Sequence, residues 1–202
     1  MFHSAAMDTE GMDQRAKRIV EIAVGLAERD GFAAVRMRDV ASQAGVALGT
    51  LYRRFRSKEE ILLAALQMES MALAEILEEH PVHGDTPRER LRHFFSIATH
   101  GLCSKPNLAR ALLRSIASAE AGVTEKVAEY HAMITRLITA AMRGGVLGDG
   151  TPTDDEATVA FLLQHVWFAT LVGWAGGLHD TEQIIEQVMA AADLLLRGME
   201  RT

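Results

Sequence analysis

The chain has 202 residues, enough for one domain of ordinary size or two small ones that share a core. Apolar residues make up 49% of it and charged residues 24%, a balance that excludes an intrinsically disordered chain, while seven Phe, two Trp, two Tyr and four Pro argue against a turn-rich β-sandwich. The net charge of −6 disfavours a protein whose whole surface binds nucleic acid.

Helix-forming residues dominate, and apolar residues recur at helical spacing along most of the chain. Residues 1–12 differ, because they are small and polar and include no Lys or Arg; we expect a disordered lead-in without a basic arm for a DNA minor groove. The first half of the chain is predicted to form helices at residues 13–30, 37–44 and 48–55, and a longer one that follows a Ser57–Glu60 capping box and ends near residue 79.

The second half shows the same helix signals, and no segment alternates as a strand would. Pro87 and Pro106 each occupy a first helical position, and residues 144–150 are expected to be a flexible connection. Capping pairs are formed by Thr86 with Glu89, Thr153 with Glu156, and Asp180 with Gln183, and the helices are predicted at 87–102, 106–118, 123–143, 154–179 and 181–199. The sequence therefore predicts nine helices and no sheet, an all-α fold.

One run, residues 157–179, contains no Asp, Glu, Lys or Arg and is long enough to span a bilayer. However, Gln164 and His165 lie in its middle, its flanks are acidic, and both tryptophans lie inside the run rather than at its ends. We therefore expect a soluble helix covered on nearly all sides, and no membrane association. The chain begins without a signal peptide and has one cysteine, Cys103, which excludes an internal disulfide, so we expect a cytoplasmic protein.

The segment that is most informative about function is residues 37–60. Between Arg36 and Lys58 six basic residues accompany one acidic residue, which gives this stretch a charge of +5 and leaves −11 for the rest of the chain. A basic block of this kind binds a polyanion locally while the remainder repels it. Two short predicted helices meet here at a tight turn around Gly45, the arrangement of a helix-turn-helix motif.

The second of these two helices is expected to face DNA. Small residues at its leading end, Ala47 and Gly49, would let it enter a major groove. Thr50 and Tyr52 carry hydroxyl groups that donate to phosphate oxygens or base edges, and Arg53 adds positive charge. A tyrosine between basic residues has little reason to be there for packing, so Tyr52 is the firmest single contact.

From Ala44 to Lys58 the chain reads AGV-x-x-GTLY-x-x-F-x-x-K, and this stretch resembles the DNA-binding domain of the TetR family of bacterial one-component regulators. The resemblance implies a homodimer that binds a palindromic double-stranded DNA operator and responds to a small-molecule effector. It also implies a recognition helix that ends at Arg53, with Tyr52 and Lys58 on phosphates.

Two positions depart from the family pattern. The family often has Ser or Thr capping its second and third helices, whereas this chain has Arg36 and Ala47. Arg36 would replace a capped phosphate contact with a charged one, and Leu48 occupies a variable position, so the sequence does not identify the operator. The resemblance assigns residues 13–57 to the DNA-binding domain and 58–202 to a helical domain for effector binding and dimerisation.

The uncharged run presents two apolar stripes, and a helix of this kind must be covered twice. In TetR-like regulators the last two helices form a four-helix dimer interface, and the domain centre holds the effector pocket. One stripe would then face the partner and the other the pocket, and we expect His165 and Phe168 on the pocket side. The stripes are Phe161, His165, Phe168 and Val172 on one side, and Ala160, Leu163, Trp167, Leu171 and Trp174 on the other.

Further pocket candidates are Phe94, Met133 and Leu137, although stripes of this kind are usually core, and a lone histidine such as His165 is more often a core residue than a ligand contact. From Lys105 onward the chain also resembles the KstR-type branch of the family, repressors of steroid breakdown. That resemblance implies a large apolar effector, such as a lipid or its thioester.

Other function classes fit less well. The sequence has no HExxH, GxSxG or phosphate-loop motif, so we expect neither an enzyme nor a cofactor. His80 and His83 flank Pro81 without further ligands, so no metal site is expected. The alternative is an all-α small-molecule binding or scaffold protein without specific DNA binding, which a weak salt dependence of DNA affinity would reveal.

Overall fold

A computed structural model describes residues 14–118, 123–145 and 151–199. Within these ranges the chain forms nine α-helices, one short 3-10 helix and no strand, which confirms the all-α prediction. The expected lead-in at 1–12 and most of the expected connection at 144–150 lie outside the described residues. The helices are α1 (Gln14–Asp30), η1 (Phe32–Ala34), α2 (Met37–Ala44), α3 (Leu48–Arg54), α4 (Lys58–Glu79), α5 (Pro87–Cys103), α6 (Pro106–Ala117), α7 (Thr124–Arg143), α8 (Asp154–Ala175) and α9 (Thr181–Met199).

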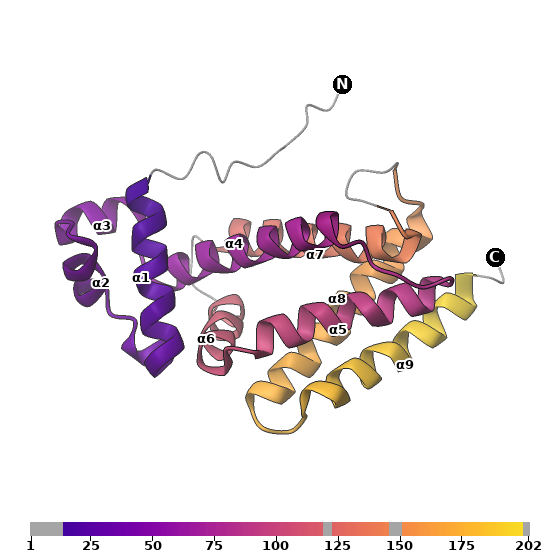
Figure 1. The fold of residues 1–202 in the computed structure, drawn as a ribbon. Helices are drawn as coiled ribbons and strands as arrows, with labels where there is room; N and C mark the ends of the chain where they lie inside the picture. The colour runs from indigo at the N-terminus through magenta and orange to yellow at the C-terminus, as the bar shows by residue number, and fades with distance from the viewer. Residues whose placement is uncertain (1–13, 119–122, 146–150, 200–202) are drawn as a thin grey trace.

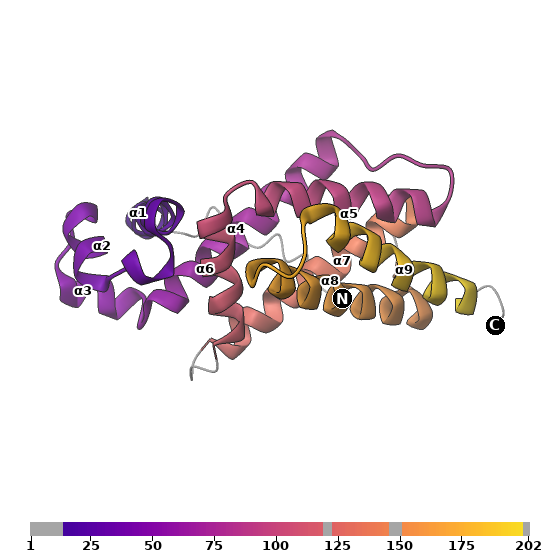
Figure 2. The ribbon, with the colours of Figure 1, turned by 90° about the horizontal axis from the view of Figure 1, so that it is seen from below.

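The helices form two bodies joined by α4. Figure 1 shows α1, α2 and α3 gathered at one end, while α4 runs from them into a larger body built with α5 to α9. The view from below shows the same separation, with α6 lying between the small body and the rest (Figure 2). The α1–α3 body therefore has its own exposed surface at one end of an elongated molecule.

Several predicted helix ends are confirmed, because their capping side chains make the expected bonds. Thr86 with Glu89 and Thr153 with Glu156 form complete capping boxes. Asp180 and Gln183 bond reciprocally at the start of α9, at 2.8 and 2.9 Å.

The box expected at Ser57 is only half formed. The Ser57 hydroxyl accepts from the backbone N–H of Glu60 at 3.3 Å, but the Glu60 carboxylate bonds the backbone N–H of Arg56 instead of returning to Ser57. Its second oxygen accepts from Lys126 of α7 at 2.7 Å. Burial opposes ionisation, but Lys126 and the Arg56 N–H outweigh it and lower the pKa of Glu60. Glu60 thus ties the α3–α4 linker to the larger body.

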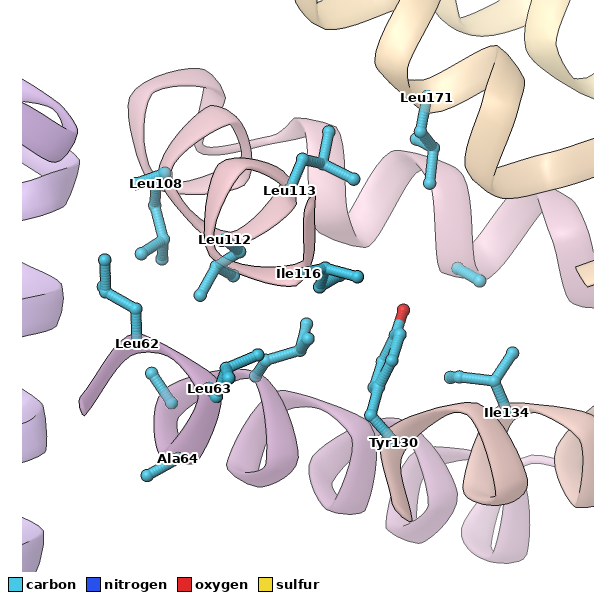
Figure 3. Packing of buried hydrophobic residues seen from close by; sticks show 14 of the residues in the cluster. Leu62, Leu63, Ala64, Leu108, Leu112, Leu113, Ile116, Tyr130, Ile134 and Leu171 are labelled. Atoms are coloured by element: carbon cyan, nitrogen blue, oxygen red, sulfur yellow. The ribbon is translucent and has the colours of Figure 1, made fainter. Parts of the chain in front are cut away.

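The core of the larger body lies where α4, α6, α7 and α8 meet. Figure 3 shows Leu62 and Leu63 of α4 facing Leu112 of α6, with Tyr130 and Ile134 of α7 beside them. All five side chains are at most 9% exposed. Burying a side chain of this size stabilises the fold by about 1.5–3 kcal/mol, so this junction fixes the larger body.

The uncharged helix α8 buries one of its two apolar stripes. Leu163, Trp167 and Leu171 are at most 3% exposed, and the Trp167 indole N–H donates to the Thr99 hydroxyl of α5 at 3.0 Å. The other stripe lies on the surface of this chain, with Phe161 52% and Val172 46% exposed. By length and composition α8 is the one helix among the described residues that could cross a membrane, with 39% of its most apolar window buried.

An ion pair at the start of α8 gives the fold a measurable pH dependence. Arg143 of α7 bonds both carboxylate oxygens of Glu156, at 2.9 and 2.5 Å. This charge-assisted bonding lowers the pKa of Glu156 to about 2, against an ordinary value of 4.5. Because the pKa is depressed, the stabilisation is present above pH 4.5 and disappears as the pH falls toward 2.

The substitution Glu156→Gln tests this pair, since Gln still completes the capping box with Thr153. At pH 7 the variant should lose about 1 kcal/mol of unfolding free energy, measured by urea denaturation. The difference between variant and wild type should shrink steadily as the pH falls below 4.5. A difference that is constant between pH 7 and pH 3 would contradict the assignment.

Candidate nucleic-acid interface and effector core

A tight turn joins α2 to α3 as the helix-turn-helix prediction requires. Gly45 ends α2 in the left-handed conformation, at φ 69°, which favours glycine, and its N–H bonds the carbonyls of Ala41 and Ser42. Val40 and Leu51 are completely buried between the helices and α1, and Phe55 is 4% exposed. Leu51 and Phe55 therefore belong to the core.

The opposite side of α3 is open to solvent. Gly49 and Arg53 are exposed, and Tyr52 is 48% exposed although it adjoins the buried Leu51. Thr50 and Leu48 are half-buried. Since consecutive residues on a helix point about 100° apart, the burial of Leu51 turns Tyr52 outward. The predicted DNA-facing side of α3 is the side that the chain leaves uncovered.

The two uncapped helix starts are present as the sequence indicated. Arg36 precedes α2 and Ala47 precedes α3, both with extended backbone and neither with a side-chain hydrogen bond to the helix. Both residues are exposed. The Arg36 guanidinium is thus free of any capping role, and its position next to α2 leaves its charge available at the surface.

Lys58 is placed differently from a simple phosphate-binding lysine. It is half-buried in the first turn of α4, and its Nζ lies 3.8 Å from the centre of the Phe32 ring. The same ammonium donates to the Phe32 carbonyl oxygen at 3.3 Å. In this structure the lysine expected on DNA is therefore held by η1.

A further basic group at the start of α1 was missed by the sequence analysis. Arg15, Lys17 and Arg18 are all exposed, and Figure 1 shows this end of α1 at the same end of the small body as α3. The signal was available, because three basic residues fall within four positions directly before the apolar stripe of α1. These side chains enlarge the positive surface of an otherwise acidic protein.

The expected pocket residues lie in a closed core. Phe94 and Leu137 are at most 1% exposed, and Met133 is half-buried against the core. A small hollow with a cavity volume of about 20 Å³ lies between α4 and α7, with Leu137 in its wall. Small-molecule sites are usually about 300–1,000 Å³, far larger than this hollow, so a large effector would have to displace core side chains. The remaining lining residues are Ala74, Leu77, Glu78, Val82, Ala140, Ala141 and Gly145.

His165 does not lie in the closed core with the other expected pocket residues, and Phe168 is only half-buried against that core, so their place at the pocket stays a prediction. His165 is exposed on the outer stripe of α8, where its Nδ1 bonds the Phe161 carbonyl at 2.7 Å, and Phe168 is half-buried. The His165 ring stacks on His131 of α7, with 5.6 Å between ring centres. The other stripe of α8 is the buried one. Its Trp167 has a polar partner in α5, whereas the His165 imidazole is bonded within its own helix.

Cys103 and His131 are titratable side chains of the larger body that are buried and half-buried, respectively. In the described part of the chain, no three His, Cys, Asp or Glu side chains converge as metal ligands. Cys103 is buried, and burial raises the pKa of its thiol to about 11, so little reactive thiolate exists at neutral pH. Burial and the neighbouring His165 lower the pKa of His131, which keeps that imidazole neutral.

Two family models match the two bodies of the structure. Residues 19–65 match bacterial regulatory proteins of the tetR family, and residues 84–195 match the tetracyclin repressor-like C-terminal domain. The chain belongs to the TetR family. It is thus a DNA-binding transcriptional regulator, from a family of regulators and not of enzymes.

The relatives of this TetR-family chain include the transcriptional repressor KstR of Rhodococcus jostii, which is 32% identical over 94% of this chain and 86% of the relative. The crystal structure of a TetR transcriptional regulator from Rhodococcus sp. RHA1 has a TM-score of 0.80 and 27% identity, covering 90% of this chain and 95% of that one. FadR of Thermus thermophilus, a repressor crystallised with lauroyl-CoA, has a TM-score of 0.69 and 22% identity over 91% of this chain and 94% of its own.

Neighbouring residues on α3 provide a direct test of the interface. Tyr52→Ala should weaken binding to an operator duplex about tenfold by removing a hydrogen bond to a charged group, with little change in stability. Leu51→Ala should instead cost about 2–5 kcal/mol of unfolding free energy, because Leu51 is completely buried.

Fluorescence anisotropy with labelled duplex and thermal unfolding by circular dichroism separate the two effects. Tyr52→Phe is the matched variant, since it keeps the ring and removes only the hydroxyl that would donate the hydrogen bond to DNA. If Tyr52→Ala unfolds the protein, or leaves DNA affinity unchanged, Tyr52 is not a DNA contact.

Proposed function

We propose that this chain is a homodimeric repressor that binds a palindromic operator and releases it when a large apolar small molecule enters its core. The observation that carries the proposal is the exposed side of α3, where Gly49 and Tyr52 are uncovered although the helix is anchored by Leu51. A helix held rigidly from behind and open in front suits insertion into a major groove.

The proposed DNA contacts fall into two groups. Residues on α3 and at its N-cap enter the groove: Ala47, Leu48, Gly49, Thr50, Tyr52 and Arg53. Arg36 and Lys58 bind phosphates from either side of the motif, and the exposed basic residues at the start of α1 extend this contact. Phosphate contacts set affinity and orientation, while the groove contacts set sequence preference.

The outer surface of α8 and α9 supports the proposed homodimer. Large apolar side chains, which a monomeric protein would bury, are exposed there. The run from residue 157 to 179 also contains no charged residue that would favour contact with water. A second copy related by a two-fold axis would bury the same patch on both chains. An operator with half-sites one turn of DNA apart would require the two α3 helices to lie roughly 34–36 Å from each other. The exposed apolar residues are Phe161, Leu162, Val172, Leu178 and Leu194.

The proposed effector is a large apolar molecule, a lipid or its thioester. The interior around Phe94, Met133 and Leu137 is apolar, which suits a hydrocarbon ligand. The KstR relatives and the FadR complex with lauroyl-CoA favour the same class. Because the core is closed in this structure, the ligand would stabilise a different packing of the helices, and it would lower DNA affinity by its preference for that state.

The proposed domain division places residues 13–57 in the DNA-binding domain and 58–202 in the effector-binding and dimerisation domain. The arrangement of the helices supports this boundary, since α4 starts at Lys58 and leads out of the small body.

In vitro selection or footprinting on DNA that flanks the gene tests the function. The protein should protect a palindromic site, and the logarithm of its affinity should fall linearly with the logarithm of salt concentration, with a slope of roughly −0.9 per phosphate contacted. Random duplex of equal length is the control. Equal affinity for selected and random DNA at physiological salt would favour the alternative of a helical binding protein without an operator.

The effector class is tested on the same complex with lauroyl-CoA as the probe and free CoA as the matched control. The thioester should release the protein from the selected duplex and CoA alone should not. Release by CoA alone, or retention of the complex at saturating thioester, would contradict an apolar thioester effector.

A further inference from the structure

Phe32 lies beside two cations that belong to different parts of the molecule. The Lys58 ammonium, at the start of α4, lies 3.8 Å from the ring centre. The Arg114 guanidinium carbon, on α6, lies 4.4 Å from the same centre. An aromatic face attracts a cation electrostatically, and two cations on one ring repel each other. The ring is therefore shared by a side chain of the DNA-binding motif and one of the effector-binding domain.

Helix α6 is fixed against the small body next to this ring. The Asn107 side chain donates to the carbonyls of Glu28 and Arg29 at the end of α1, both at 3.2 Å. Lys105 pairs with the Glu28 carboxylate at 3.4 Å. These contacts hold the first turn of α6 to α1. A rotation of α6 about this anchored turn would therefore move Arg114, in the last turn of α6, relative to Phe32.

The same helix also contacts the end of α8. Arg110 precedes Arg114 by one turn, and its Nε donates to the carbonyl of Ala175 at 3.2 Å. Its guanidinium lies 5.3 Å from the centre of the Trp174 ring. Two arginines one turn apart thus connect the end of α8 to η1 through a single short helix.

We propose that Arg114 is a positioning residue for DNA binding, which acts by sharing the Phe32 ring with Lys58 and thereby sets how readily Lys58 leaves the ring for a DNA phosphate. This inference rests on the proposed function. In the free protein Lys58 occupies the ring, and on the operator it moves to the phosphate. Repulsion from Arg114 weakens the hold of the ring on Lys58, so displacement of α6 changes the affinity for DNA.

The chain has four lysines, Lys17, Lys58, Lys105 and Lys126, so their positions can be followed individually. Reductive methylation with ¹³C-formaldehyde keeps the charge and gives each lysine an NMR signal, assigned by single Lys→Arg variants. In the free full-length protein the Lys58 methyl signal should lie upfield of Lys17 and Lys105, because it sits over an aromatic ring. On addition of the selected duplex it should move downfield.

Substitutions at Arg114 and Phe32 test whether the arginine acts through the ring. Arg114→Met should increase the upfield shift of Lys58 and weaken operator binding about two- to fivefold, the range expected for one exposed cation–π contact. Arg114→Lys should restore the wild-type chemical shift of Lys58 and the wild-type affinity for the operator. Phe32→Leu keeps the apolar contact but should abolish the shift, and Arg114→Met should then have no further effect on DNA affinity.

The outcomes separate this inference from the proposed function. If the wild type binds its operator but Lys58 is not shifted upfield, or stays upfield on DNA, the inference fails and the function stands. An equal effect of Arg114→Met with and without Phe32 would also overturn it, because the arginine would then act by its charge alone. If the wild type selects no DNA, the function fails and the inference with it. Thermal unfolding of each variant confirms that it is folded.

Discussion

The surface of α8 is the constraint on which the rest of the structure depends. This helix is apolar on two sides, and the helices of the described residues cover only one of them. The buried side is fixed by Trp167, whose ring packs against Phe95 while its N–H bonds Thr99. The outer side leaves large hydrophobic side chains in water, which costs free energy in proportion to the exposed area. A second copy of the chain, as proposed above, would remove that cost.

The proposed dimer would explain why the small body lies at one end of the molecule. One α1–α3 body carries one α3 helix, and it stands apart from α8 and α9 at the far end of the molecule. Pairing through α8 and α9 would leave both α3 helices uncovered, as an operator with two half-sites requires. The connections to the larger body include polar and charged contacts outside the core, such as Glu60 with Lys126 and Asn107 with the end of α1. Contacts of this kind can rearrange without loss of the core.

Local signals in the sequence were enough to predict most of the fold. Helix ends followed from capping residues such as Thr153, since a cap acts within a few residues of itself. The turn at Gly45 was equally local. The 3-10 helix η1 was not foreseen, because the three residues of Phe32–Ala34 carry no periodic pattern.

The site was harder to predict, because its details depend on packing between distant elements. The two stripes of α8 are similarly apolar, so the sequence could not show which would be buried or that His165 would lie on the exposed one. The hold of Phe32 on Lys58 joins residues 26 positions apart and left no signal in the local sequence.

The mass of the protein in solution tests the central claim most directly. Sedimentation equilibrium at micromolar concentration should give twice the chain mass of 22.1 kDa. Phe161→Glu, which puts a charge on the outer stripe of α8, should reduce it to a single chain, while Ile76→Glu, at an equally open apolar position on α4, should leave the dimer intact. A wild-type protein that sediments as one chain, or a Phe161→Glu variant that remains dimeric, would contradict the account.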